Sequence, residues 1–122
     1  MALVLVIDDE LLMRRMVQRV LAADGHTVLE AEDGRIGLEL LRTHQPAIVI
    51  TDILMPEKEG LETIQEIRKT NSSIKILAMS GGASYDAPIL RWAERLGADA
   101  ILRKPFHTDE LLEAVSGLLA TA

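Results

Sequence analysis

Short apolar runs alternate with amphipathic stretches along this 122-residue chain. Five runs have the length and composition of buried strands, and they occupy residues 3–7, 27–31, 47–51, 74–79 and 100–103. Between and after them, hydrophobic residues recur at helical spacing over residues 11–23, 34–45, 60–70, 87–96 and 109–120. The pattern therefore predicts five strand–helix units with short connections.

Turn and capping residues mark the ends of the predicted helices. Gly25 and Gly97 follow the first and fourth helices, where glycine commonly ends a helix. Asp33 and Thr108 are suited to cap the starts of the second and fifth helices. Pro46 stops the second helix, because the residue before a proline avoids the helical conformation.

Strict alternation of strands and helices is typical of a parallel sheet with helices on both of its faces. The first and third runs are apolar almost throughout, as expected of strands that are buried on both sides. No linker, repeat or low-complexity segment interrupts the pattern. One α/β domain over residues 1–122 is therefore expected.

Composition narrows the possible functions. Hydrophobic residues make up 48% and charged residues 26%, as in folded globular proteins. With only three aromatic residues the core must be aliphatic, and binding of nucleic acid through stacked bases is poorly supported. The net charge of −6 also argues against a partner with a phosphate backbone, although it is equally compatible with plain solubility.

Other classes of protein are disfavoured by features that the sequence lacks. No cysteine is present, so neither a disulfide framework nor thiolate chemistry is available. No apolar run approaches the roughly 20 residues that cross a membrane, and the first residues do not have a signal-peptide layout. The sequence thus predicts a cytoplasmic protein without a membrane partner.

Polar side chains follow four of the five predicted strands. Asp8 and Asp9 come after the first strand, Asp52 after the third, Ser80 after the fourth and Lys104 after the fifth. The carboxyl ends of parallel strands meet at one edge of a sheet, which is where open α/β sheets bind ligands. We therefore expect the five side chains to lie close together.

The residue types favour a divalent cation and a phosphoryl group. Carboxylates suit Mg²⁺, with Mn²⁺ as a possible substitute, and three carboxylates at one edge would repel one another without a cation. Asp52 could act as a nucleophile that forms an acyl phosphate. Pro56 restricts the residue before it to an extended conformation, so that the Leu54 carbonyl can face the metal.

Lys104 and Ser80 complete the expected site. An ammonium group suits a phosphoryl oxygen, and a cis bond before Pro105 would aim Lys104 inward. The Ser80 hydroxyl could donate to a phosphoryl oxygen, with Gly81 leaving room. Each residue also has an ordinary interpretation, as a solvated helix start, a loop residue or a surface lysine, and only their combination is strong evidence.

With these residues the sequence resembles a known family, the receiver domains of two-component response regulators. The resemblance covers the whole chain and is carried by Asp8-Asp9, Asp52 with Met55-Pro56, Ser80, and Lys104-Pro105-Phe106. It implies a flavodoxin-like doubly wound fold, with five parallel strands in the order 2-1-3-4-5.

The resemblance also implies a role for each site residue. Asp52 is the phosphoacceptor, and Lys104 and Ser80 contact the phosphoryl oxygens. Asp9, Asp52 and the Leu54 carbonyl bind Mg²⁺, with Asp8 helping through a water molecule. The domain would catalyse its own phosphorylation rather than turn over a substrate as an enzyme does.

Implied partners are a sensor histidine kinase or phosphotransfer protein as donor, and an unknown output protein. The face between the fourth and fifth helices would contact the output protein, and the domain would be a monomer or a phosphorylation-dependent dimer. Phosphorylation is expected to reorder the loop at residues 81–87.

Two features depart from the family. Ile101 stands where the family usually has an aromatic switch residue. Leu54 and Gly82 offer no side-chain hydrogen bond to an attacking water, which predicts slow loss of the phosphoryl group.

Three other functions could use a similar set of residues. A hydrolase of the haloacid-dehalogenase type needs a second aspartate two residues after the first, where Leu54 stands. A flavin carrier is disfavoured by the acidic loop after the first strand. A receiver-like binding module that acts without phosphorylation remains the main alternative.

Overall fold

The computed structural model describes residues 1–53, 60–71, 73–81 and 87–120, the first four of the last range by backbone alone. The strands are β1 (Leu3–Ile7), β2 (Thr27–Ala31), β3 (Ile48–Asp52), β4 (Lys75–Ser80) and β5 (Ala100–Arg103). The helices are α1 (Leu11–Ala23), α2 (Gly34–His44), α3 (Gly60–Thr70), α4 (Ala87–Leu96) and α5 (Thr108–Ala120).

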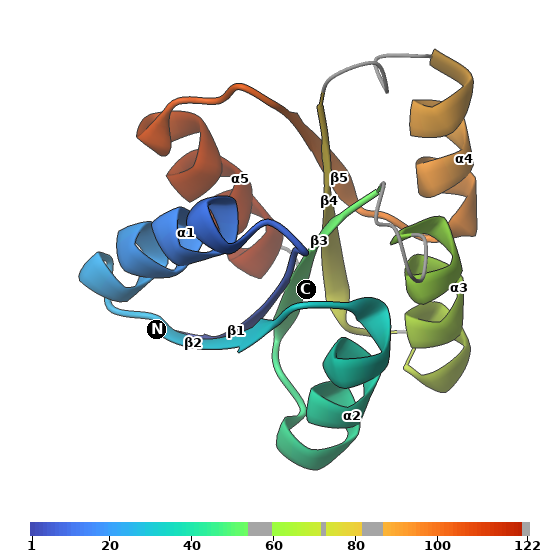
Figure 1. The fold of residues 1–122 in the computed structure, drawn as a ribbon, viewed down its shortest axis with the longest axis horizontal. Helices are drawn as coiled ribbons and strands as arrows, with labels where there is room; N and C mark the ends of the chain where they lie inside the picture. Colours follow the sequence, from blue (N-terminus) through green and yellow to red (C-terminus); the bar gives the residue numbers. More distant parts are fainter. Residues whose placement is uncertain (54–59, 72, 82–86, 121–122) are drawn as a thin grey trace.

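The strands form one parallel sheet in the order β2-β1-β3-β4-β5 (Figure 1). The register runs from Val6 across to Ile50 and from Ile50 to Leu77, so the strand ends are nearly level. This is the flavodoxin-like topology expected from the sequence, and the prediction of fold class is confirmed.

Helices cover both faces of the sheet (Figure 1). Helices α1 and α5 lie on one face, over a cluster that includes Val6, Ile50 and Leu111. Helices α2, α3 and α4 lie on the other, over a cluster that includes Val49 and Ile64. The central strands contribute alternate residues to the two clusters, which explains their unbroken apolar sequence.

Local signals account for several helix ends. The Asp33 carboxylate accepts a hydrogen bond of 2.9 Å from the Ile36 N–H, which confirms the predicted cap of α2. Gly25 and Gly97 follow α1 and α4 with φ angles of 94° and 127°, a conformation that favours glycine. Gln45 adopts a similar conformation after α2, with φ of 51° and its N–H donating to the Leu41 carbonyl.

Six boundaries differ from the predictions by one residue: both ends of β3 and of β4, the end of α2 and the start of α5. Strands β3 and β4 include Asp52 and Ser80, because Asp52 pairs with Met79 and Ser80 pairs with Arg103. Helix α5 includes Thr108, which was predicted to precede it. The His107 carbonyl accepts from the Leu111 N–H, so the cap lies one residue earlier.

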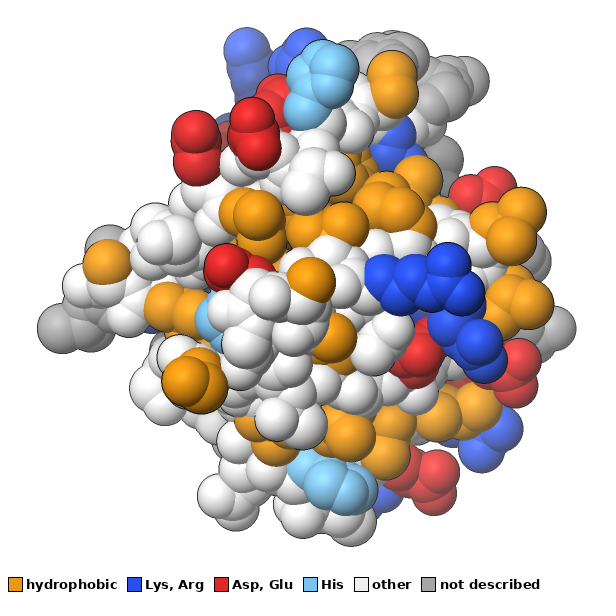
Figure 2. All heavy atoms as spheres, turned by 90° about the vertical axis from the view of Figure 1, so that its left-hand side faces the viewer, with side chains coloured by type: hydrophobic (Ala, Val, Ile, Leu, Met, Phe, Trp, Pro, Cys, Tyr) orange, Lys and Arg blue, Asp and Glu red, His pale blue; other side chains and the backbone are white. Residues whose placement is uncertain are grey.

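The surface has a mixed character. The side of the molecule formed by α1, α5 and the edge strand β2 carries hydrophobic, acidic and basic side chains interspersed with one another (Figure 2). Among the described residues, no helix is long and apolar enough to cross a membrane.

Candidate functional site

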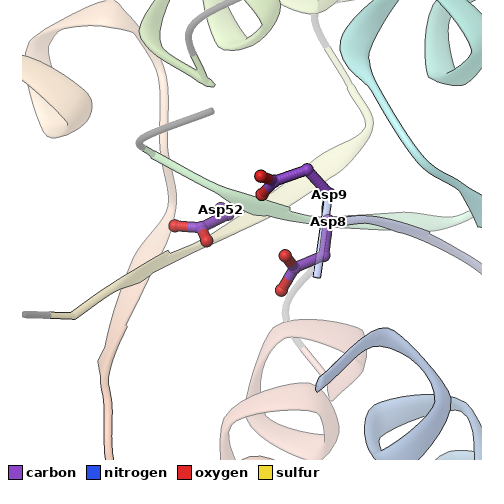
Figure 3. A group of neighbouring side chains, drawn as sticks. All are labelled: Asp8, Asp9 and Asp52. Atoms are coloured by element: carbon purple, nitrogen blue, oxygen red, sulfur yellow. The ribbon is translucent and has the colours of Figure 1, made fainter. Parts of the chain in front are cut away.

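The carboxyl edge of the sheet gathers the predicted acidic residues. Asp8 and Asp9 directly follow β1, and Asp52 is the last residue of the neighbouring strand β3. Figure 3 shows their three side chains grouped where these strands end. One carboxylate oxygen from each residue lies within 4.8 Å of the other two, as the strand pattern predicted.

The three carboxylates differ in exposure. Asp8 is fully buried, the Asp52 side chain is 14% exposed and Asp9 is exposed to solvent. Oxygen ligands on one side and solvent on the other suit Mg²⁺, which keeps several of its waters when it binds to proteins. The donor set therefore fits the cation expected from the sequence.

Main-chain and side-chain contacts hold Asp8 in place. Its N–H donates to the Ala31 carbonyl at 3.1 Å, and its carboxylate accepts from the Glu10 N–H at 2.9 Å. Its own carbonyl accepts from Arg14 Nη1 at 2.9 Å. Asp8 is thus tied to β2 and to the start of α1, which fixes one wall of the site.

Lys104 places its ammonium group among the carboxylates. Lys104 Nζ lies 2.9 Å from an oxygen of Asp52 and 3.4 Å from an oxygen of Asp8. The residue follows β5, its N–H donates to the Ser80 carbonyl, and its peptide bond to Pro105 is cis. The Lys104 ammonium group therefore lies between the carboxylates of Asp8 and Asp52.

Burial and charge shift two pKa values in this group. Burial raises the pKa of the Asp8 carboxyl above its ordinary value, and the charge of Asp52 adds to this, while the Glu10 N–H and Lys104 oppose it. Burial alone would lower the pKa of Lys104, but the contacts with Asp52 and Asp8 outweigh it and raise that pKa. Lys104 is thus a stable ammonium group at neutral pH.

Ser80 lies at the end of β4, next to the strand that leads to Lys104. It is fully buried, and its Oγ has no hydrogen-bond partner among the described residues. A buried hydroxyl in that condition is uncommon in folded proteins. It fits a site in which a polar group is to be bound.

The space beside Gly81 is taken by the stem of Lys104. A Cβ atom on Gly81 would lie 2.9 Å from Lys104 Cβ and 3.0 Å from its Cδ. The glycine thus lets the lysine chain lie flat against β4 and reach Asp52. The sequence predicted free space beside Gly81, but it did not predict that the Lys104 side chain fills this space.

Several predicted features lie outside the described residues. These are the Leu54 carbonyl, Met55-Pro56, Gly82 and most of the 81–87 loop. Ile101 is described, and it lies half-buried in β5, opposite Ala78, against the cluster under α3 and α4. The effect of Ile101 on switching stays a prediction.

Sequence reasoning missed two contributors to the site. Gly60 was identified only as the start of a helix, yet a Cβ there would lie 2.6 Å from Ile53 Cα and 2.7 Å from its carbonyl oxygen. Arg14 was not singled out from the sequence, and its bond to the Asp8 carbonyl depends on tertiary structure. For Gly60, the only signal in the sequence was a glycine at the predicted start of a helix that closely follows a strand.

Fold and site together define a doubly wound α/β protein with an acidic site and a lysine at the carboxyl edge of its sheet. Residues 4–116 match the family model described as "Response regulator receiver domain". The chain therefore belongs to the receiver domain family of two-component response regulators.

Known proteins agree with this assignment. The chain is 33% identical over 117 residues to the chemotaxis protein CheY of Bacillus subtilis, covering 95% of this chain and 96% of CheY. It is 34% identical over 116 residues to the response regulator MprA of Mycolicibacterium vanbaalenii, covering 95% of this chain but 49% of MprA. The chain thus spans about half the length of MprA.

A solved structure shares the fold over almost its full length. The receiver domain of NtrX from Brucella abortus superposes with a TM-score of 0.91 at 30% sequence identity, covering 98% of this chain and 99% of that domain. The strand order and the helices of the present structure are therefore those of a receiver domain.

Proposed function

We propose that this receiver domain accepts a phosphoryl group on the side chain of Asp52 and thereby switches its contacts with other proteins. The observation that carries the proposal is the position of Lys104 Nζ, 2.9 Å from Asp52 within a cluster of three carboxylates. The donor is a phosphohistidine on a sensor histidine kinase or a phosphotransfer protein, as membership of the family suggests.

In the proposed reaction, a carboxylate oxygen of Asp52 attacks phosphorus and the bond between phosphorus and the donor's histidine nitrogen breaks. The bonding electrons return to the imidazole, and Asp52 becomes an acyl phosphate. The Lys104 ammonium offsets negative charge on a phosphoryl oxygen, and the Ser80 hydroxyl donates to another. The residues act once per phosphoryl group, so the domain is not a turnover enzyme.

Asp9 and Asp52 are the proposed direct ligands of Mg²⁺, with Asp8 bound through water and the Leu54 carbonyl, outside the described residues, as a further ligand. When bound, the ion supplies positive charge that lowers the barrier to phosphoryl transfer. Mn²⁺ would serve as a substitute, because it accepts the same oxygen ligands.

Other properties follow from family membership and stay proposals. Residues 1–122 would act as one receiver domain in the cytoplasm, as a monomer or as a dimer that depends on phosphorylation. The output partner would be a protein that contacts the face between α4 and α5. Nucleic acid is not a proposed direct partner of this domain.

Intact-mass spectrometry after incubation with acetyl phosphate and Mg²⁺ tests the proposal. The wild type should gain one phosphoryl group, and Asp52→Asn should gain none, because an amide is not a nucleophile of this kind. Asp109→Asn makes the same change at an exposed position in α5 and should behave as the wild type.

Two outcomes would contradict the proposal. No mass gain in the wild type would favour a receiver-like module that acts without phosphorylation. Equal gains in the wild type and Asp52→Asn would place the phosphoryl group on another residue.

A further inference from the structure

Arg14 and Arg15 of α1 both contact Glu30 of β2, but Arg14 is less exposed and also reaches the main chain of Asp8. The Arg14 guanidinium points back to the strands, where Nη1 donates to the Asp8 carbonyl at 2.9 Å and Nε bonds Glu30 of β2 at 3.1 Å. Its side chain is only 12% exposed, whereas that of Arg15 is 57% exposed. Arg14 thus links α1, β2 and the chain segment that carries the acidic pair.

The carbonyl that Arg14 holds belongs to the peptide unit between Asp8 and Asp9. A peptide unit is rigid and planar, so fixing its oxygen fixes its orientation. The N–H of Asp8 is also held, by the Ala31 carbonyl at 3.1 Å. The backbone at the first of the two carboxylates is therefore held on both sides.

Asp9 depends on that backbone for its position. Its side chain is exposed, and its carboxylate accepts no hydrogen bond from the residues that the structure describes. The peptide unit that precedes Asp9 fixes where its side chain starts, and so how far its carboxylate can reach toward Asp52. A change in the orientation of that unit would move one of the three carboxylates away from the others.

Arg14 reaches the site without occupying its ligand atoms. It donates to a neutral main-chain carbonyl, so the carboxylate oxygens of Asp8 and Asp9 stay available to a cation. The carboxylate of Glu30, 25% exposed, lies against the guanidinium and offsets its charge. The arrangement orients the site and adds little net positive charge to it.

We propose that Arg14 is a positioning residue, which fixes the Asp8–Asp9 peptide and thereby sets the affinity of the acidic site for a divalent cation, with Glu30 orienting Arg14. This inference rests on the metal site of the proposed function. It predicts that Arg14 strengthens the binding of Mg²⁺, whereas the positive charge of Arg14 alone would weaken that binding. An arginine acting by charge alone would repel Mg²⁺, so that its removal would tighten binding.

Titration of the unphosphorylated protein with Mg²⁺ by isothermal calorimetry tests the inference. Arg14→Met, which keeps an apolar stem, should weaken binding by about 10-fold or more, the usual effect of losing a group that orients ligands. Arg14→Lys should lie between this variant and the wild type, since an ammonium group can keep one of the two bonds. Circular dichroism would confirm that each variant is folded at the temperature used.

Arg15→Met is the matched control. It removes the same charge from the neighbouring position, and it removes a 3.2 Å contact with the same carboxylate of Glu30, but within the described part of the chain Arg15 makes no hydrogen bond to Asp8. Its affinity for Mg²⁺ should stay within about 2-fold of the wild type, as is usual for an exposed charge.

A kinetic measurement separates positioning from general loss of stability. With acetyl phosphate as donor, Arg14→Met should need more Mg²⁺ for half-maximal phosphorylation, while its rate at saturating Mg²⁺ stays within about 2-fold of the wild type. If Arg14→Met bound Mg²⁺ as tightly as the wild type, or more tightly, the role of Arg14 would be overturned and the proposed metal site would stand. A wild type that binds no Mg²⁺ would overturn this role together with the proposed metal site.

Discussion

Asp8 places a carboxylate in the interior of the molecule, fully buried and beside two other carboxylates. Its raised pKa means that the folded protein binds a proton there more tightly than the unfolded chain. The stability linked to that proton is present below the unfolded pKa and is lost as pH rises through the folded pKa. At pH values above the folded pKa, the charge of Asp8 therefore destabilises the fold relative to the protonated form.

The first prediction concerns Asp8→Asn. Without Mg²⁺ at neutral pH, the substitution should raise the free energy of unfolding by about 1 kcal/mol, because it removes a buried charge and the repulsion with Asp52. Urea unfolding followed by circular dichroism measures this. In the wild type Mg²⁺ should raise the unfolding midpoint, and in Asp8→Asn that rise should be much smaller. A variant less stable than the wild type without Mg²⁺ would contradict the argument.

Lys104 gives a second prediction at this scale, because it is both a counter-charge and a proposed contact of the phosphoryl group. Lys104→Met should bind Mg²⁺ more tightly than the wild type, since a positive charge 2.9 Å from a ligand carboxylate is removed. Its phosphorylation by acetyl phosphate should nevertheless slow by about 100-fold, in line with losing a donor to developing charge. Calorimetry and mass spectrometry measure the two effects separately.

The combination of tighter Mg²⁺ binding and slower phosphorylation is what would identify an effect of the Lys104 charge. Lys75→Met, at the far end of β4, removes the same charge and should change neither quantity appreciably. If Lys104→Met bound Mg²⁺ more weakly, Lys104 would be acting on the shape of the site rather than on its charge.

The start of α3 lies against the end of β3, the strand that carries Asp52. The Gly60 N–H donates to the Ile53 carbonyl at 2.7 Å, and the helix starts against the backbone of residues 52 and 53. A side chain at this position would meet main-chain atoms, which cannot move aside as the end of a flexible side chain can. The start of α3 therefore fixes where β3 ends.

The third prediction compares two helical glycines. Gly60→Ala should destabilise the protein by roughly 2 kcal/mol or more, as overpacking usually does, and should slow phosphorylation of Asp52. Gly117→Ala, in α5 with no atom within 4 Å of the added Cβ, should instead stabilise by about 0.5–1 kcal/mol. Urea unfolding of both variants tests this. A higher free energy of unfolding in Gly60→Ala would contradict this, because it would mean that α3 can move away from β3 without loss of stability.

The elements were predictable from sequence because their signals are local. Apolar runs and helical periodicity identified each strand and helix in the described part of the chain, and Asp33 and Gly25 act as ends for the reasons given. Boundaries at Asp52 and Ser80 were missed by one residue, because they depend on pairing with a neighbouring strand. Hydrophobic pattern does not carry that information.

The site was predictable to the extent that topology brings it together. Asp8, Asp52 and Lys104 meet because parallel strands end at one edge, and that could be deduced from their positions after apolar runs. The contacts of Arg14 and Gly60 could not, since each depends on how closely a helix approaches a strand. The sequence thus indicated which side chains meet at the sheet edge but not the groups that hold them in place.

At the scale of the whole molecule, one sheet is shared by two hydrophobic clusters. Adjacent residues such as Val49 and Ile50 of β3 belong to opposite clusters. Unfolding of a central strand would therefore disrupt both clusters. Helices on opposite faces make few direct contacts and are coupled through the sheet. We therefore expect both faces to unfold in one cooperative transition.

Trp92, the only tryptophan, makes this expectation measurable, because it lies on α4 on one face, while Leu111 is fully buried under α5 on the other. Leu111→Ala should lower the free energy of unfolding by about 3 kcal/mol, as for other buried leucines. The urea midpoint from Trp92 fluorescence should fall as far as that from circular dichroism. Glu113→Ala, exposed on the same helix, should move either midpoint little. A Trp92 midpoint unchanged in Leu111→Ala would mean that the two faces unfold separately.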